Sequence, residues 1–249
     1  MLIMNGKKSK NFISVVLPVY NSSLFIERNI KKLINFLSDV ADEWEIIAVN
    51  DGSTDSTDSI LHNLAKRQKN LIIAGRAEQK GKGFSVREGV LQARGDFIFF
   101  IDADLPYELK VLESMMLFLK EEYDVVIVNR ALRESFAKNK ANLFRRAASR
   151  VFRLMVYLIT RLRIKDTQAG LKGFRREAAH RIFPLLITEG FAFDIEILLL
   201  AKHMKLKIKE VPAILDDSGI SSINLIKESF RMAYDLFRIV RRHKISIND

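Results

Sequence analysis

The stretch FIFFIDADLP, residues 97–106, decides the fold class of this sequence. Its first five residues are apolar without alternation, which is typical of a central strand in a parallel sheet that helices cover on both faces. Asp102 and Asp104 follow directly, and Pro106 comes two positions after the second aspartate. Because the ligands of α/β folds gather at the carboxyl ends of the strands, these aspartates are predicted to mark a functional site.

Strand and helix signals alternate around this stretch. The expected strands are FISVVLP, WEIIAVN, LIIAG, FIFFID and DVVIVN, and the expected helices are SLFIERNIKKLINFL, SILHNLAKR, GFSVREGVLQA and ELKVLESMMLFLK. In the first helix one apolar stripe recurs at helical spacing, formed by Ile26, Ile30, Leu33 and Leu37. Short strands that alternate with helices predict a mostly parallel sheet with right-handed crossovers. At 249 residues the chain is expected to form one α/β domain.

Positive charge is concentrated in one segment. The net charge of the chain is +11, and residues 130–165 contain eleven lysines and arginines against Glu134 alone. Such a block predicts an anionic partner, which is a nucleic acid, a phosphate-bearing substrate or the anionic face of a membrane. The block lacks regularly interleaved aromatic residues and base-reading signatures, so a nucleic-acid-binding module is only a remote alternative.

Two segments have the composition of amphipathic helices. Residues 141–163 carry apolar positions 144, 148, 151, 155, 158 and 162 on one side with arginines between them. A second segment near the C-terminus carries a stripe at positions 226, 230, 233, 237 and 240 and ends in RIVRRHK. Such helices lie in a membrane interface with their arginines at the headgroups, or they pack the stripe on the core of the domain, and the sequence leaves both open. The stripes could also pair two copies of the chain, so a homo-oligomer is a further expectation.

The sequence favours a cytosolic setting. It contains no cysteine, which excludes disulfides and thiolate metal sites. The start, MLIMNGKKSKN, lacks the apolar core of a signal peptide. Outside the strands the longest strongly apolar stretch is LMVYLIT at 154–160, far shorter than the roughly 20 residues of a spanning helix. The chain is therefore not expected to cross a membrane by itself.

Three polar loops follow the other expected strand ends. In PVYN, Asn21 or the following Ser22 is expected to cap the next helix. In NDGSTDST, Asp51 accepts hydrogen bonds from a base or ribose, or it caps a helix together with Ser53. The loop EQKGKGFSVREG places two glycines and two lysines, one of them Lys82, before a helix N-terminus, and this pattern fits a phosphate cradle.

The loop DADLP carries the most specific chemistry. Two carboxylates separated by Ala103 at the end of a buried strand can converge on one hard divalent cation, Mg²⁺ or Mn²⁺. Such a cation would bridge a diphosphate and neutralise its charge as a leaving group. The alternative is that Asp104 caps a helix that begins near Pro106, while Asp102 bonds to the backbone. The glycine-rich basic loop and the Asp-Gly-Ser turn at neighbouring strand ends favour the metal site.

Five motifs, in this order and spacing, resemble the inverting family-two nucleotide-sugar glycosyltransferases, and within them the polyprenyl (dolichyl) phosphate sugar transferases. The motifs are PVYN, VNDGSTDST, KGKGFSVREGVLQARGDFIFFIDADL, DTQAGLKGF and GFAFDIEILLLAKHMKLKIKEVPA. The resemblance extends from about Phe12 to Arg242 and implies one Rossmann-like GT-A domain with a mostly parallel sheet and basic amphipathic interface helices. The implied parts of this 1–249 domain are a nucleotide-sugar-binding half at 12–130, an acceptor half at 131–215 and a basic amphipathic helix at 220–249.

The resemblance also implies roles for individual residues. The positions around the nucleotide sugar are Pro18, Tyr20, Asn21, Asp51, Lys82, Asp102 and Ala103. Asp102 would face the ribose or the metal, and Asp104 would be the principal metal ligand. The positions that resemble the acceptor-phosphate site are Arg130, Arg145 and Ser149. Asp194 and Glu196 match an acidic patch near the sugar, and the implied catalytic residues are Asp104, Asp194 and Arg130.

The implied reaction is the metal-dependent, inverting transfer of a hexose from a nucleoside diphosphate sugar to a polyprenyl or dolichyl phosphate at the cytoplasmic face of a membrane. DTQAGLKGF is closer to the glucosyl members, and Pro106 stands where some mannosyl members carry a metal-ligating side chain, so UDP-glucose is favoured over GDP-mannose. GDP-mannose stays open as the donor. A hydroxyl acceptor, with Asp194 as the base, also stays open. Many relatives with this acceptor carry C-terminal spanning helices, but no spanning helix is expected in this sequence. The chain is therefore expected to dock peripherally or to need a membrane-protein partner.

Overall fold

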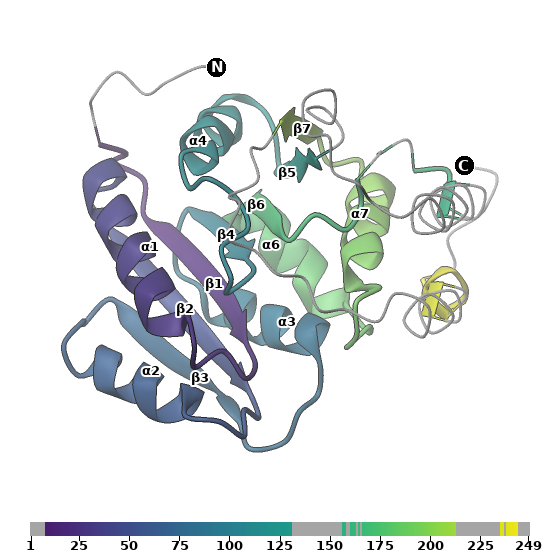
Figure 1. Cartoon of the computed structure of the whole chain (residues 1–249). Coiled ribbons are helices and arrows are strands. Elements are labelled where there is room, and N and C mark those ends of the chain that lie inside the picture. The colour runs from purple at the N-terminus through teal and green to yellow at the C-terminus, as the bar shows by residue number, and fades with distance from the viewer. Residues whose placement is uncertain are drawn as a thin grey trace, which may run out of the picture.

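Strands and helices alternate along the first 129 residues of the computed structural model, as the sequence predicts (Figure 1). The structure describes residues 8–130, 156–157, 160–162, 164, 166–212, 235–236 and 238–243. The elements are β1 (Ile13–Val19), α1 (Ile26–Val40), β2 (Trp44–Asp51), α2 (Thr57–Ala65), β3 (Leu71–Arg76), α3 (Lys82–Gln92), β4 (Phe97–Ile101), α4 (Val111–Glu121), β5 (Val125–Asn129), β6 (Leu171–Arg175), α6 (Arg176–Ile182), the 3₁₀ turn η2 (Phe183–Leu185), α7 (Phe193–His203) and β7 (Ile208–Pro212).

The described strands form one seven-stranded sheet in the order β3-β2-β1-β4-β6-β5-β7. β1 is parallel to β2 and β4, β2 is parallel to β3, and β5 is parallel to β7. The mostly parallel α/β sheet is therefore confirmed. β6 is the exception, because it is antiparallel to both β4 and β5.

The antiparallel direction of β6 brings a distant loop to the end of β4. Ile101, the last residue of β4, pairs with Leu171, the first residue of β6. The loop after β4 and the loop before β6 therefore lie at the same edge of the sheet. The amide of Asp102 donates a hydrogen bond to the carbonyl of Gly170 at 3.1 Å, which joins the two loops.

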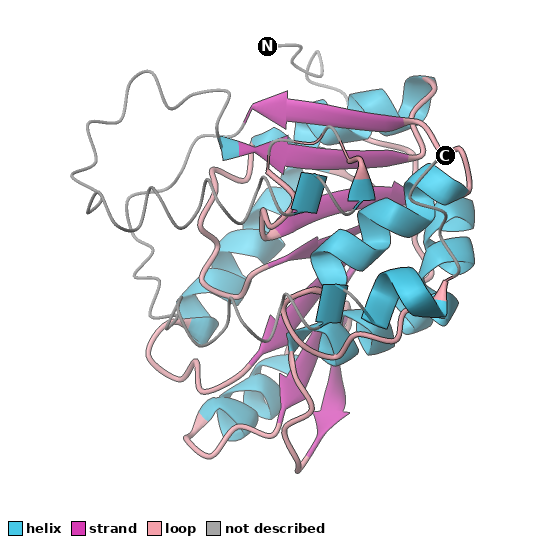
Figure 2. Cartoon of the chain, turned by 90° about the vertical axis from the view of Figure 1, so that its right-hand side faces the viewer, coloured by secondary structure: helices cyan, strands magenta, loops and turns pink. Residues whose placement is uncertain are grey.

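Helices cover both faces of the sheet (Figures 1 and 2), with α1, α2 and α4 on one face and α3, α6 and α7 on the other. The predicted stripe of α1 is confirmed, because all four of its residues are buried in the first core. The five residues of β4 are also buried. Phe99 and Ile101 join one core while Ile98 and Phe100 join the other, which explains why the FIFFI run is apolar without alternation.

The described part of the C-terminal segment packs on the second core. Leu236 and Ile239 are fully buried there, while Val240 of the predicted stripe is only half-buried. Of the two alternatives for this segment, membrane-interface binding and packing on the core, the structure supports packing on the core for the described part. Most of the other amphipathic segment, 141–163, lies outside the described residues. In the portions of the chain that the structure covers, no helix combines the length and apolar character of a membrane span.

The backbone conformation near the end of β3 requires glycine at position 75. The φ of Gly75 is +132°, and a Cβ placed there would lie 2.1 Å from the carbonyl oxygen of Asn50 on β2. Gly75→Ala is therefore expected to lower the free energy of unfolding by about 1–3 kcal/mol, which for a chain of this size is about 2–4 °C of Tm for each kcal/mol. Thermal unfolding of this variant beside Glu78→Ala, an exposed position two residues into the next loop, measures the difference. Equal melting temperatures for the two variants would contradict the requirement for glycine at position 75.

Candidate active site

The loop after β4 is held in a fixed turn. The carbonyl of Ala103 accepts a hydrogen bond from Asn29 Nδ2 at 2.9 Å, and the amide of Leu105 donates to the carbonyl of Asp102 at 2.9 Å. The next helix, α4, begins only at Val111 and has no side-chain cap. The alternative that Asp104 caps this helix is therefore wrong.

Asp102 and Asp104 each present a buried carboxylate oxygen at this edge. Among the described residues Asp104 Oδ1 has no hydrogen-bond partner, and Asp102 Oδ1 meets Lys82 Nζ in an ion pair at 2.6 Å. Burial raises the pKa of Asp104, and the charge of Asp102 raises it further. A buried carboxylate oxygen left without a donor at such a position fits a hard divalent cation.

The number of carboxylates fits a cation that is shared with a substrate. Among the residues that the structure describes, no group of three or more His, Cys, Asp or Glu side chains is arranged to hold a metal ion. Mg²⁺ is commonly bound through one or two carboxylates together with water and substrate phosphates. Asp102 and Asp104 therefore suit a cation that arrives with a phosphate-bearing ligand.

Lys82, the first residue of α3, points toward these carboxylates. Burial opposes its charge, but Asp102 and Asp194 together with Asp104 outweigh that effect and raise its pKa. Lys82 is therefore a positive charge that is paired with Asp102 and lies near Asp104. The two lysines were expected before the helix, but α3 already begins at Lys82. Phosphate binding by this lysine stays a prediction.

Asp51, the last residue of β2, fixes the glycine-rich loop. Its carboxylate accepts hydrogen bonds from the amides of Lys80 at 3.0 Å and Gly81 at 2.8 Å, and from Arg76 Nη1 at 2.8 Å. The helix α2 follows Ser56 as its N-cap, so the alternative in which Asp51 and Ser53 cap it is wrong. Contact between Asp51 and a nucleotide stays a prediction.

The PVYN loop is hydrogen-bonded to the loop after β2. Asn21 Oδ1 accepts a hydrogen bond from the amide of Thr54 at 2.8 Å, and the amide of Asn21 donates to Ser53 Oγ at 3.0 Å. Tyr20 is exposed and Pro18 is half-buried. α1 begins without a side-chain cap, so the expected capping by Asn21 or its neighbour is wrong. The nucleotide contacts of Pro18, Tyr20 and Asn21 stay predictions.

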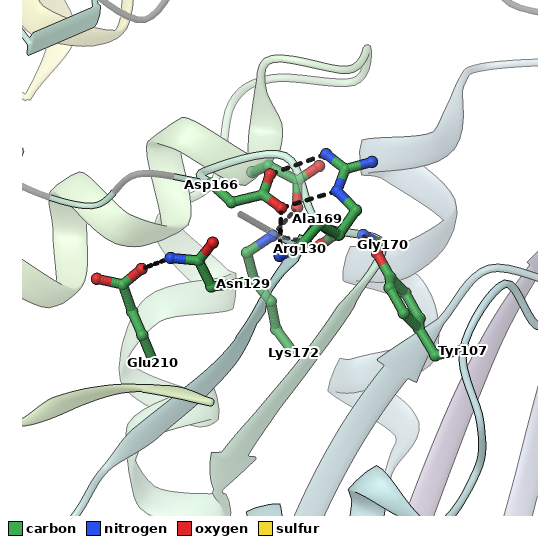
Figure 3. Close-up of polar contacts among 9 residues, drawn as sticks. Tyr107, Asn129, Arg130, Asp166, Ala169, Gly170, Lys172 and Glu210 are labelled. Atoms are coloured by element: carbon green, nitrogen blue, oxygen red, sulfur yellow. Dashed lines mark hydrogen bonds and ion pairs between the residues drawn. The ribbon is translucent and has the colours of Figure 1, made fainter. Parts of the chain in front are cut away.

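Arg130 lies just after β5 and is held by Asp166 (Figure 3). Its Nε and Nη2 donate to the Asp166 carboxylate at 2.7 and 2.8 Å, and its amide donates at 3.0 Å. The hydrogen bonds to Asp166 raise the pKa of Arg130. Burial opposes the charge of Asp166, but the same hydrogen bonds lower its pKa. The Arg130 side chain is 42% exposed, so this anchored cation still faces solvent. Arg145 and Ser149 lie outside the described residues.

A buried ion pair lies beneath this edge of the sheet. Lys172 of β6 is fully buried, and its Nζ donates to the carbonyl of Ala169 at 2.9 Å (Figure 3). The same Nζ donates to Asp194 Oδ1 on α7. Burial lowers the pKa of Lys172 against the attraction of Asp194, and burial raises the pKa of Asp194 against that of Lys172. The Asp194 carboxylate is therefore already ion-paired with Lys172 inside the protein.

Comparison with known proteins fits this geometry. Residues 14–183 match the family described as Glycosyl transferase family 2. The chain belongs to this family. It is therefore a glycosyltransferase, and the predicted enzyme class is confirmed.

Relatives of this glycosyltransferase are similar over most of its length. It is 33% identical over 248 residues to a dolichyl-phosphate beta-glucosyltransferase of Dictyostelium discoideum, which covers 95% of this chain and 76% of the relative. It is 34% identical over 254 residues to the Saccharomyces cerevisiae protein of that name, with the same two coverages. The predicted resemblance to this group within the family is confirmed.

Solved structures support the fold. Glucosyl-3-phosphoglycerate synthase from Mycobacterium tuberculosis, in complex with Mn²⁺, uridine diphosphate and phosphoglyceric acid, has a TM-score of 0.66. The similarity covers 95% of this chain and 80% of that one at 20% sequence identity, so it carries the fold alone. The predicted GT-A fold is confirmed.

The sequence did not point to three of the site's internal contacts. Asp166 is the first residue of DTQAGLKGF, but its partner Arg130 lies 36 residues away. Lys172 gave no signal beyond a lysine between apolar neighbours. Glu196, which the resemblance places near the sugar, is fully buried, and its carboxylate accepts hydrogen bonds from the amides of Ile187 and Thr188.

Gly170 makes room for Asp102. A Cβ on Gly170 would lie 2.0 Å from Asp102 Oδ2 and 2.6 Å from its Cγ, so any larger residue must displace that carboxylate. Gly170→Ala is therefore expected to lower kcat/KM for sugar transfer about a hundredfold, since misplacing a reacting group by about 1 Å has effects of this size. A double-mutant cycle with Asp102→Ala provides the control, because the double variant should be no worse than Asp102→Ala alone. Additive losses would show that Gly170 acts elsewhere.

Proposed function

We propose that this glycosyltransferase transfers glucose from UDP-glucose to dolichyl phosphate or a related polyprenyl phosphate, with inversion at the anomeric carbon. The observation that carries the proposal is the pair of buried oxygens of Asp102 and Asp104 at one edge of the sheet, where Asp104 Oδ1 has no partner in the described structure and Asp102 Oδ1 meets only Lys82. The names of the relatives at 33% and 34% identity support glucose as the sugar and dolichyl phosphate as the acceptor.

Asp102 and Asp104 would hold Mg²⁺ or Mn²⁺. When bound, this cation supplies positive charge to the diphosphate that departs from the sugar. Lys82 adds a second, fixed positive charge at the same edge of the sheet. Asp51 keeps the loop of Lys82 in place through the amides of Lys80 and Gly81.

A phosphate acceptor suits the described acids and bases better than a hydroxyl acceptor does. A phosphate oxygen is already ionised near neutral pH, so it needs no strong general base, whereas a sugar hydroxyl does. Asp194, the candidate base for a hydroxyl, is 2% exposed and is bound to Lys172. This supports the phosphate acceptor over the hydroxyl alternative.

Arg130 would bind the acceptor phosphate. Asp166 fixes the guanidinium in one orientation, while the side chain remains exposed enough to meet an anion. We place Arg145 and Ser149 in the same role. In the reaction the acceptor oxygen forms a bond to the anomeric carbon as the bond to the diphosphate breaks, and the bonding electrons leave with the diphosphate. Positioning and charge stabilisation would supply most of the rate enhancement.

The basic segment 130–165 supports a site of action at an anionic membrane surface. A long-chain lipid phosphate is held in such a surface, so the enzyme must meet it there. We place the enzyme peripherally on the cytoplasmic face, with a membrane-protein partner or a second copy of the chain as candidates for further anchoring.

Transfer of labelled sugar tests the proposal. The purified protein is incubated with UDP-glucose or GDP-mannose and a detergent-dispersed polyprenyl phosphate, with Mn²⁺ or Mg²⁺ and with EDTA. Lipid labelling from UDP-glucose that EDTA abolishes is the expected result. The dephosphorylated polyprenol is the matched control acceptor and should remain unlabelled. Labelling from GDP-mannose alone, or of the polyprenol, would overturn the assignment of donor or acceptor.

A further inference from the structure

The C-terminal helix, of which the structure describes residues 235–236 and 238–242, is bound to the interior through one buried carboxylate. Glu196 of α7 is fully buried, and its Oε1 forms a hydrogen bond with His243 Nε2 at 2.7 Å. The same carboxylate accepts the amides of Ile187 at 3.0 Å and Thr188 at 2.9 Å. Glu196 therefore joins the end of the C-terminal helix to the loop 186–190 that precedes α7.

This loop supports the start of α3 on both sides of Lys82. The amide of Gly83 donates a hydrogen bond to the carbonyl of Glu189 at 2.8 Å. A Cβ on Gly83 would lie 2.5 Å from the carbonyl oxygen of Thr188, and one on Gly81 would lie 2.5 Å from that of Glu189. The two backbones are thus in direct contact, and any shift of the 186–190 loop moves the base of Lys82.

We propose that Glu196 and His243 are positioning residues for the donor site. His243 holds Glu196, Glu196 holds the 187–188 amides, and that loop holds the start of α3 so that Lys82 reaches Asp102. This inference rests on the proposed donor site. Removal of His243 takes one of three hydrogen bonds from this buried carboxylate and leaves the 187–188 amides as its remaining partners, so the carboxylate and the backbone bound to it are expected to shift.

The contact gives the C-terminal helix a role in binding the donor. Leu236 and Ile239 anchor this helix in the second core, and His243 follows them at its end. The His243 side chain is 13% exposed and that of Glu196 is fully buried, so their hydrogen bond is shielded from solvent. A helix that the sequence marks as amphipathic and basic is thereby coupled to the nucleotide-sugar loop.

Two substitutions of His243 separate this coupling from simple packing. His243→Leu removes the ring nitrogen that meets Glu196, whereas His243→Gln keeps an N–H donor. We expect His243→Leu to raise the KM for UDP-glucose about tenfold and to change kcat by less than about threefold. His243→Gln should stay within about twofold of the wild type in both constants. Leu37→Ala, in the opposite core, is the control for general loss of stability and should leave KM unchanged.

Hydrogen exchange of the ligand-free protein tests the coupling without any substrate. In His243→Leu the amides of Gly83, Ile187 and Thr188 should exchange faster, while those of β1 and β2 keep their wild-type rates. Unchanged exchange at these three amides, or equal increases in KM for His243→Leu and Leu37→Ala, would overturn the inference. If wild-type protein does not bind UDP in the presence of Mn²⁺, the proposed donor is wrong, and the exchange rates still decide the coupling.

Discussion

Asp104→Asn is expected to lower kcat/KM for sugar transfer about a thousandfold while the protein stays folded. The amide removes the negative charge that would bind the cation, and metal-ion stabilisation of a leaving group is worth several kcal/mol, or about 4 kcal/mol for a thousandfold loss. Burial and Asp102 already raise the pKa of Asp104, so neutralising this side chain should leave Tm unchanged or raise it. Labelled transfer gives kcat/KM, and thermal unfolding gives Tm.

Neutralising a second carboxylate nearby is the control for Asp104→Asn, because it removes one negative charge from the same region without touching the site. Glu108 is exposed four residues beyond Asp104, and Glu108→Gln should keep wild-type activity. Binding of Mn²⁺, followed by electron paramagnetic resonance, should be weakened in Asp104→Asn and unchanged in Glu108→Gln. Full metal-dependent turnover by Asp104→Asn would refute the mechanism.

Lys172→Met is expected to lower the free energy of unfolding by about 3–5 kcal/mol, because it leaves the buried Asp194 carboxyl without its partner. Replacing both members, in Lys172→Met/Asp194→Leu, should recover most of that loss, since no buried polar group is then unsatisfied. Urea unfolding at neutral pH measures these two variants and the single variant Asp194→Leu, and the double-mutant cycle gives the coupling energy.

A surface pair provides the comparison for Lys172. Lys31 and Glu27 form an ion pair at 2.6 Å with both side chains more than half exposed. Lys31→Met should leave the free energy of unfolding almost unchanged, because solvent screens such pairs. If Lys172→Met is as mild as Lys31→Met, the pair with Asp194 is not a stabilising element of the fold.

The sequence predicts the first half of the fold well because its strands are apolar runs. β4 is buried on both faces, so five consecutive apolar residues mark it without help from the rest of the chain. β6 carries no such signal, since its five residues, LKGFR, include a lysine and an arginine. Lys172 can be buried there only because Asp194 reaches it from α7, 22 residues further along the chain. A contact of this kind cannot be read from the local sequence.

In the candidate site, too, some residues can be predicted from local sequence and others cannot. Asp102, Asp104 and Lys82 were expected together because parallel strands end at one edge of the sheet, and they do lie together. The capping alternatives failed because the helices begin later than the polar residues suggest, as α4 does at Val111. The contact of Asp166 with Arg130 has no local sequence signal, because it depends on β6 running antiparallel to its neighbours.

The pair between Arg130 and Asp166 has a consequence for how this family can diversify. These residues bracket positions 131–165, so one ion pair holds the two ends of that stretch together. Loop-closure entropy grows by only about 0.6 kcal/mol for each doubling of loop length. A change in the length of this stretch therefore costs little closure entropy while Arg130 and Asp166 keep its ends together. Relatives can differ in length here and still keep β5 and β6 paired in the same register.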